Sequence, residues 1–96
     1  MTLSKFRFPI GQVFMTRGIA ELITENPSAA GEIQRSLIRH NSGDWGNLCD
    51  EDKQTNEEAL AEGFRVLSAY TVCGKKIWII TESDRKTTTI LFPDEY

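Results

Sequence analysis

The stretch that decides the fold is FRVLSAYTVCGKKIWIITESDRKTTTILFP, residues 64–93. It contains three runs rich in β-branched and aromatic residues, which are typical of strands: Phe64–Cys73, Lys76–Glu82 and Thr87–Phe92. Gly74-Lys75 suits a two-residue hairpin turn and Ser83–Lys86 suits a longer one. Pro93 ends the last run because it cannot donate to a strand ladder. The sequence therefore predicts a C-terminal three-stranded antiparallel meander.

The turns also predict which residues lie opposite each other. A turn at Gly74-Lys75 places Tyr70 opposite Ile79, and the four-residue turn places Ile79 opposite Ile90. Alternation then gives a core face, whose expected members are Phe64, Val66, Tyr70, Val72, Ile77, Ile79, Ile90 and Phe92. The opposite face combines polar residues with three large apolar ones, Trp78, Ile80 and Leu91. Either another element covers that face or it is a contact surface.

The residues before the meander predict a short strand at Gln12–Thr16 and about three helices, so the fold class is α+β. Helical spacing of apolar residues and capping residues mark the helices. The expected helices run from Thr16 to Asn26, over about 29–40 after Ser28, and over about 51–62 after Asp50. A chain of 96 residues is expected to form a single domain, with residues 1–9 irregular and flexible.

The charge of the chain bears on the kind of partner. The formal net charge is −3 and the isoelectric point is about 5.1. Proteins that coat nucleic acids usually present a basic face, so nucleic acid is not expected as the main partner. An acidic balance suits a basic partner surface, although it also serves solubility alone.

The sequence contains no signal for a cofactor, a metal site or a membrane-spanning segment. The two cysteines, Cys49 and Cys73, match no zinc spacing with the single histidine, so no metal or cofactor is expected. No run approaches the ~18 apolar residues that span a membrane, and the first ten residues lack the apolar core of a secretory leader. We therefore expect a cytoplasmic protein with reduced thiols and no membrane contact.

The loop over residues 41–49, NSGDWGNLC, is the best candidate for a site. Two glycines bracket Asp44 and Trp45 and permit close approach of the backbone. The loop is either a contact site with Trp45 as its anchor, or a structural turn whose tryptophan plugs the edge of the core. We predict that Trp45 is partly exposed beside the sheet face that carries Trp78. The expected partner-binding residues are Asp44, Trp45, Trp78 and Arg85.

Two weaker signals point to catalysis. His40, the only histidine, precedes Asp44 by four residues and is either a general base or the decoration of a helix end. Arg85 begins the run RKTTT, which is either a phosphate-contacting turn or a solvated hairpin followed by a strand. No nucleophile is tied to His40 by its spacing, so the sequence favours a protein that is not an enzyme.

Two segments carry a resemblance to known proteins. One is RHNSGDWG, residues 39–46, followed by Glu51, Asp52 and Asn56; the other comprises SAY, WIITESDR and TTILFPDEY within residues 68–96. Over residues 10–96 the chain resembles a family of short, mostly uncharacterised proteins encoded on bacterial plasmids, phages and integrated elements. The resemblance, with the acidic charge and the mixed sheet face, implies a small protein-binding module of a mobile genetic element. Its partner would be a host or element-encoded protein, and its role inhibition of a host defence of the anti-restriction or anti-CRISPR type.

A second likeness is to the fold group of barnase, RelE and colicin-type RNases, which also place N-terminal helices before a C-terminal antiparallel sheet. It implies a metal-independent RNase, and the matching positions are His40, Arg85, Thr87, Thr89 and Tyr96. The chain departs from that pattern because such toxins are mostly basic and this chain is acidic.

A third possibility is a structural homodimer. The outer strand of the meander, Thr87–Phe92, or the first strand would pair edge to edge across a two-fold axis. This possibility requires an uncovered strand edge.

Overall fold

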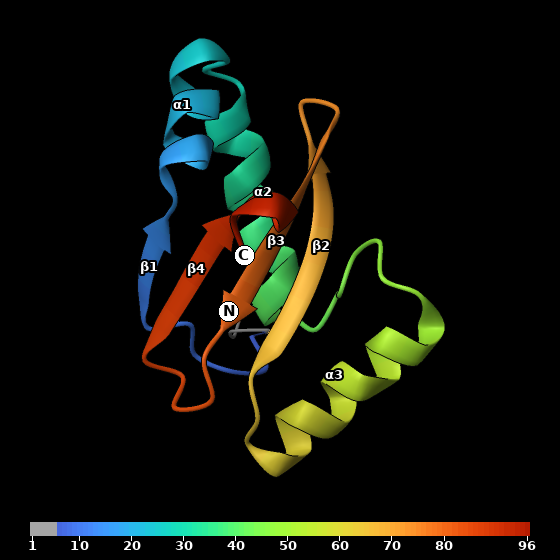
Figure 1. The fold of residues 1–96 in the computed structure, drawn as a ribbon. Helices are drawn as coiled ribbons and strands as arrows, with labels where there is room; N and C mark the ends of the chain where they lie inside the picture. The colour runs from blue at the N-terminus through green and yellow to red at the C-terminus, as the bar shows by residue number, and fades with distance from the viewer. Residues whose placement is uncertain (1–5) are drawn as a thin grey trace, which may run out of the picture.

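The computed structural model describes residues 6–96 as an α+β fold with three α-helices and a four-stranded sheet (Figure 1). The elements in chain order are β1 (Gln12–Met15), α1 (Arg17–Glu25), α2 (Ala29–Asn41), α3 (Asp50–Glu62), β2 (Val66–Val72), β3 (Lys75–Thr81), β4 (Thr87–Leu91) and the short 3₁₀ helix η1 (Pro93–Glu95). The flexibility expected at the N-terminus falls partly on residues 1–5, which lie outside the described residues.

The sheet is mixed and is not a simple three-stranded antiparallel meander. Its strand order is β1-β4-β3-β2. The pairs β2–β3 and β3–β4 are antiparallel as predicted, but β1 lies parallel to β4. The backbone N–H groups of Gln12 and Thr16 donate to the carbonyls of Lys86 and Ile90, at 2.9 and 3.1 Å. The strand over residues 87–91 is therefore interior, and the expectation that it forms an outer edge is wrong.

The hairpin between β2 and β3 turns one residue earlier than predicted. Cys73 and Gly74 both have positive φ, 50° and 77°, as a type I′ turn requires, so Val72 pairs with Lys75. The side chain of Glu32 on α2 accepts a hydrogen bond from the Cys73 N–H at 3.0 Å and holds it in place. Every pair shifts by two residues, which leaves each side chain on its predicted face. The second turn has the predicted register, with Ile79 opposite Ile90.

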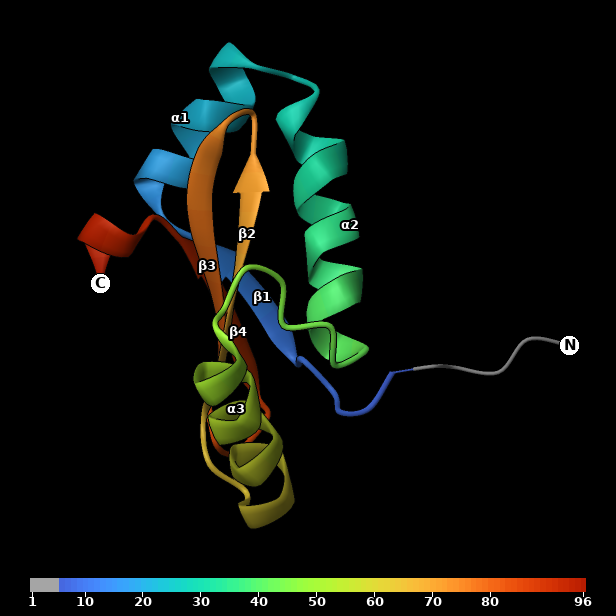
Figure 2. The same ribbon diagram turned by 90° about the vertical axis from the view of Figure 1, so that its right-hand side faces the viewer.

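Helix α2 lies along one face of the sheet and α1 lies at the upper end, beyond β1, and together they enclose the main core (Figure 2). Its buried members are Ile19, Leu22, Ala29, Ile33, Tyr70, Val72, Ile77, Ile79 and Ile90. Thr16 caps α1 as predicted and accepts a hydrogen bond from the Ile19 N–H. Phe64 was expected in this core but is 62% exposed, because Gly63 turns the chain at φ 81° and β2 begins only at Val66.

A second, smaller core lies where the N-terminal segment, the 41–49 loop and α3 meet β2. Its buried members are Phe8, Trp45, Ala59 and Val66, with Ile10, Leu48 and Leu60 packed against them. Residues 6–9, which were expected to be flexible, are held here: Phe8 is buried and the Arg7 N–H donates to the Asn41 carbonyl at 2.7 Å. Helix α3 stands beside the β2 edge of the sheet, apart from α1 and α2 (Figures 1 and 2).

Candidate functional site

The glycine-rich loop is a structural joint. Arg39 donates two hydrogen bonds to the Asp44 carboxylate, at 2.8 and 3.2 Å, and these bonds hold the pKa of Asp44 below its usual range. The Tyr70 hydroxyl donates to the Asp44 carbonyl at 2.6 Å. Gly46 has φ 74° and lies against β2, where a Cβ atom would be 1.9 Å from the Ala69 carbonyl oxygen. Only glycine fits this approach, so the loop residues serve to fasten α2 to the edge of the sheet.

Trp45 is a core residue, and the prediction that it is partly exposed is wrong. It is 3% exposed, and its ring stacks on Phe8 and meets the His40 ring edge to face. The indole N–H donates to the Glu57 carboxylate at 2.9 Å. Hydrogen bonds from Arg7 and from Trp45 lower the pKa of Glu57 to about 2. Trp45 packs with Val66 on the helix-covered face, while Trp78 lies on the other face, so the two tryptophans do not form one surface.

His40 is fully buried at the end of α2 and joins a chain of hydroxyl groups beneath the sheet. Its Nδ1 lies 2.5 Å from the Ser68 hydroxyl and its Nε2 lies 2.8 Å from the Thr81 hydroxyl. Thr81 is 2.7 Å from the Thr88 hydroxyl, which donates to the Ile10 carbonyl. Because that carbonyl can only accept, the Thr88 hydroxyl uses its one proton there and accepts from Thr81. Thr81 in turn accepts from His40, so the proton of a neutral His40 is on Nε2. Burial, with a smaller effect of the nearby Arg85 charge, lowers the pKa of His40 to about 3.

The residues named for an RNase do not converge. Both nitrogens of His40 are engaged and its side chain is closed to solvent. Thr88 points toward His40, so the alternation of β4 places Thr87 and Thr89 on the opposite face of the sheet. Arg85 lies over the Phe8 ring, 5.5 Å from its centroid, and donates to the Glu82 carbonyl. The buried His40 is therefore not available as a base beside this arginine.

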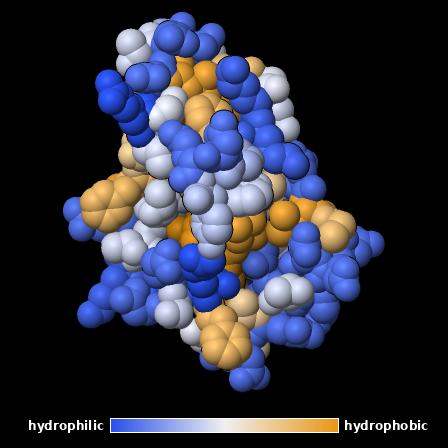
Figure 3. All heavy atoms as spheres, in the orientation of Figure 1, coloured by the Kyte–Doolittle hydropathy of each residue, from blue (hydrophilic) through white to orange (hydrophobic). Residues whose placement is uncertain are grey.

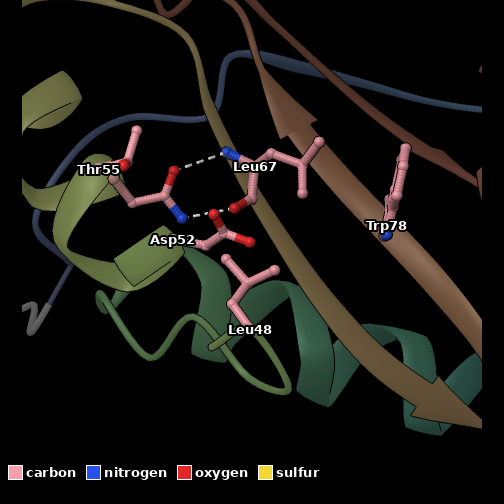
Figure 4. A pocket seen from close by; sticks show the side chains of 6 residues that line it. Leu48, Asp52, Thr55, Leu67 and Trp78 are labelled. Atoms are coloured by element: carbon pink, nitrogen blue, oxygen red, sulfur yellow. Dashed lines mark hydrogen bonds between the residues drawn. The ribbon is translucent and has the colours of Figure 1, made fainter. Parts of the chain in front are cut away.

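The surface feature best suited to a site is a groove with a volume of about 320 Å³. It lies between α3 and the face of the sheet that carries Leu67 and Trp78, which we call the second face. Its lining residues are Leu48, Asp52, Thr55, Asn56, Leu67 and Trp78. Figure 4 shows Asp52 and Thr55 on α3, Leu48 in the loop before it, Leu67 on β2 and Trp78 on β3, around an open space. The walls are mostly apolar, as in ligand-binding clefts.

Asn56 fixes the distance between α3 and the sheet. Its Nδ2 donates to the Leu67 carbonyl at 2.5 Å and its Oδ1 accepts from the Leu67 N–H at 3.1 Å (Figure 4). Asp52, four residues before Asn56, lies on the same side of the helix, and Thr55 also lines the groove, so the clamp holds both in the groove wall. The groove is thus a built feature of the fold.

The C-terminal segment covers part of the second sheet face. The Glu95 carboxylate accepts hydrogen bonds from the Thr16 hydroxyl and from the Gly18 and Phe92 N–H groups. Tyr96 then meets the Trp78 ring edge to face, with ring centroids 5.8 Å apart. Figure 3 shows this side of the molecule, where apolar surface over the middle of the sheet lies among hydrophilic side chains. The face is therefore partly covered: Ile80 and Leu91 are buried, while Leu67 and Trp78 stay partly exposed, and a role as a contact surface stays a prediction.

Of the four residues predicted to bind a partner, only Trp78 lines the groove. Asp44 is paired with Arg39, Trp45 is buried and Arg85 is stacked on Phe8. Sequence reasoning missed the other lining residues because they are ordinary side chains that three separate elements bring together. One signal was present: the positions of the third helix on the side of the sheet, Asp52, Thr55 and Asn56, are polar where a fully packed helix would be apolar.

Three further observations concern metal sites, cysteines and membrane-spanning helices. Among residues 6–96, no group of three or more His, Cys, Asp or Glu side chains is placed to hold a metal ion. Cys49 and Cys73 are both free thiols. None of the helices in residues 6–96 has the length and apolar character needed to cross a membrane. Comparison of the chain with protein-family models, with curated proteins and with solved structures finds no match.

Proposed function

We propose that the protein is a small protein-binding module and that its contact surface is the groove between α3 and the second sheet face. The observation that carries the proposal is the position of Trp78, a half-buried aromatic ring in the wall of an open, largely apolar groove. Aromatic anchors in such positions dominate the energetics of protein interfaces. The resemblance to proteins of mobile elements suggests a host or element-encoded partner, and inhibition of a host defence as the role.

Binding is favoured over catalysis by what the groove contains. Its lining has no histidine, cysteine or lysine, and its one carboxylate, Asp52, has no second ionisable group among the lining residues to act with it as an acid–base pair. The histidine that an RNase would need is enclosed on the other face of the sheet. A groove with a rigid aromatic wall and few polar groups is better suited to holding a side chain than to transforming one.

Replacing Trp78 by alanine should abolish partner capture and leave the fold in place. The ring is half-buried, so its loss should lower the free energy of unfolding by at most about 2 kcal/mol, whereas loss of an interface anchor weakens binding by about 2 kcal/mol or more. The measurement is quantitative capture of host proteins on immobilised wild-type and variant protein, with circular dichroism to verify folding. Phe64→Ala is the matched control, because Phe64 is an exposed aromatic residue outside the groove. Equal capture by the Trp78 variant and the wild type would refute the proposal.

A second candidate function, homodimerisation, is favoured by the free edge of β1. Gln12 and Thr16 direct their N–H groups to β4, so by alternation Val13 and Met15 direct their N–H and C=O groups away from the sheet. Val13, Phe14 and Met15 are 38%, 46% and 46% exposed. An antiparallel two-fold pairing centred on Phe14 would join Val13 of each copy to Met15 of the other.

We expect the mass from light scattering to rise toward a dimer with protein concentration, and Met15→Lys to keep the protein monomeric. A lysine on an edge strand opposes strand pairing and does not disturb the β1–β4 ladder, because the Met15 backbone points outward. Ile38→Lys is the control, since Ile38 is an equally exposed apolar residue on α2. A monomeric mass for the wild type at the highest concentration would exclude this candidate.

A further inference from the structure

We infer that the groove receives a cationic side chain of the partner, arginine in particular; this inference rests on the proposed function and specifies the partner's chemistry. The groove joins three apolar side chains to a single charged group, the carboxylate of Asp52 (Figure 4). Within the described residues, that carboxylate accepts no hydrogen bond and forms no ion pair. An occupant must therefore match both an apolar wall and an unpaired negative charge.

The net charge of α3, which forms one wall of the groove, has the same sign as Asp52. Helix α3 holds six acidic residues and one lysine, a net charge of −5. The whole chain carries −3, so the residues outside α3 carry +2. The negative charge of the molecule is thus concentrated on the element that forms one wall of the groove. Such a concentration attracts a basic segment and repels an acidic one before contact is made.

Neutral and anionic occupants fit the groove less well. A purely apolar side chain would remove water from Asp52 without offering a partner, which is costly for a charged group. An anionic side chain would be repelled by the negative charge of Asp52 and of α3. Arginine and lysine combine an aliphatic stem, which can lie along Leu48 and Leu67, with a charged head that can reach the carboxylate. The groove therefore selects long basic side chains.

Arginine fits better than lysine because of the Trp78 ring. A guanidinium group stacks on an aromatic face and donates two parallel hydrogen bonds to a carboxylate, whereas an ammonium group acts as a point charge. The molecule already contains this arrangement at another place. The guanidinium of Arg39 is bonded to Asp44 and lies over the Tyr70 ring, 4.9 Å from its centroid. Asp52 and Trp78 likewise provide a carboxylate and an aromatic ring, and the partner would supply the guanidinium group.

The test uses N-acetyl-arginine amide as the probe and the two indole N–H signals of the protein as reporters in NMR titrations. The Trp78 signal should shift and saturate with a dissociation constant on the order of 1 mM, as a small ligand allows. The Trp45 signal should not move, because that indole is buried and bonded to Glu57. N-acetyl-citrulline amide has nearly the same shape without the charge. It should bind about fivefold more weakly or worse, the order expected for a charged pair at an open site.

Two variants locate the charge that matters. Asp52→Asn should weaken arginine binding to the level of citrulline, while Glu51→Gln should leave it unchanged. Glu51 is the matched control because it lies in the same helical turn, carries the same charge and does not line the groove. Equal binding of arginine and citrulline, or equal effects of the two variants, would overturn the inference while the Trp78 shift upheld the groove as a binding site. A Trp78 signal unmoved by either probe would also overturn it, and capture by the Trp78→Ala variant would then decide the proposed function separately.

Discussion

Replacement of Trp45 by alanine should lower the free energy of unfolding by about 3–5 kcal/mol, the cost of truncating a large aromatic side chain in a core. The ring fills the second core between Phe8, Ala59 and Val66, and it is closed to solvent. Domains of this size have about 5–15 kcal/mol of stability in total. Urea denaturation monitored by circular dichroism should therefore show a midpoint far below that of the wild type.

Two further variants separate the parts of this effect. Trp45→Phe keeps most of the ring and loses the hydrogen bond to Glu57, so it should cost less than the alanine variant. Glu57→Gln keeps the packing and tests the carboxylate alone, which Arg7 also contacts at 2.8 Å. A loss below about 1 kcal/mol for Trp45→Ala would contradict the assignment of Trp45 to the core.

Acidification from pH 7.5 to pH 5 should remove about 2 kcal/mol of stability through His40. The pKa of this residue is about 3 in the folded protein and 6.5 in the unfolded chain. Between these values the unfolded chain binds more protons, so stability falls as the pH falls, by up to about 1.4 kcal/mol per unit. The carboxyl groups whose pKa is lowered in the fold, such as Glu57, lose their contribution only at more acidic pH. Urea denaturation at several pH values between 7.5 and 5 measures the slope.

The single histidine makes this prediction easy to isolate. In His40→Gln the slope over this interval should vanish, although the variant is less stable at every pH. An NMR titration of the wild-type imidazole gives a second measurement that does not depend on the variant folding. A ring that titrates near pH 6.5 in the folded protein would contradict the buried, neutral state described here.

The sequence was sufficient for elements whose signals are local. Strand residues alternate over residues 64–92, and Thr16 begins a helix with apolar residues at helical spacing, so these elements and the sheet faces were predictable. The partner of β1 was not, because a parallel pairing between residues 12–15 and 87–90 leaves no local pattern. Because this pairing leaves no local pattern, the interior position of β4 could not be predicted either.

The register of the first hairpin needed information from outside the hairpin. Turns at Cys73-Gly74 and at Gly74-Lys75 leave the same side chains in the core, so apolar patterning cannot distinguish them. In the structure, Glu32 bonds to Cys73, and His40 bonds to Ser68 and Thr81. These contacts come from α2, more than 25 positions away in the chain. A local rule for turns therefore chose the wrong one.

The candidate site was predictable only in part. Trp78 was named because the second sheet face carries more apolar residues than water alone would favour. The glycines around Trp45 indicated close backbone approach, which is present at Gly46, but they cannot tell whether that approach is to a partner or to β2. The groove itself depends on how Asn56 holds α3, which is a tertiary contact.

The two edges of the sheet have unequal consequences for self-association. Along the outer edge of β2, backbone groups are already hydrogen-bonded. Asn56 bonds to the backbone of Leu67, and the backbone of Trp45 and Asn47 in the 41–49 loop bonds to that of Ala69. At the end of the strand, Glu32 bonds to the Cys73 N–H. Growth of a fibre needs two bare edges on every molecule, so that each added copy offers a new one. Within residues 6–96 the uncovered edge is that of β1, and a pairing there consumes it. Assembly through the sheet should therefore stop at two copies, which protects a concentrated solution from runaway polymerisation.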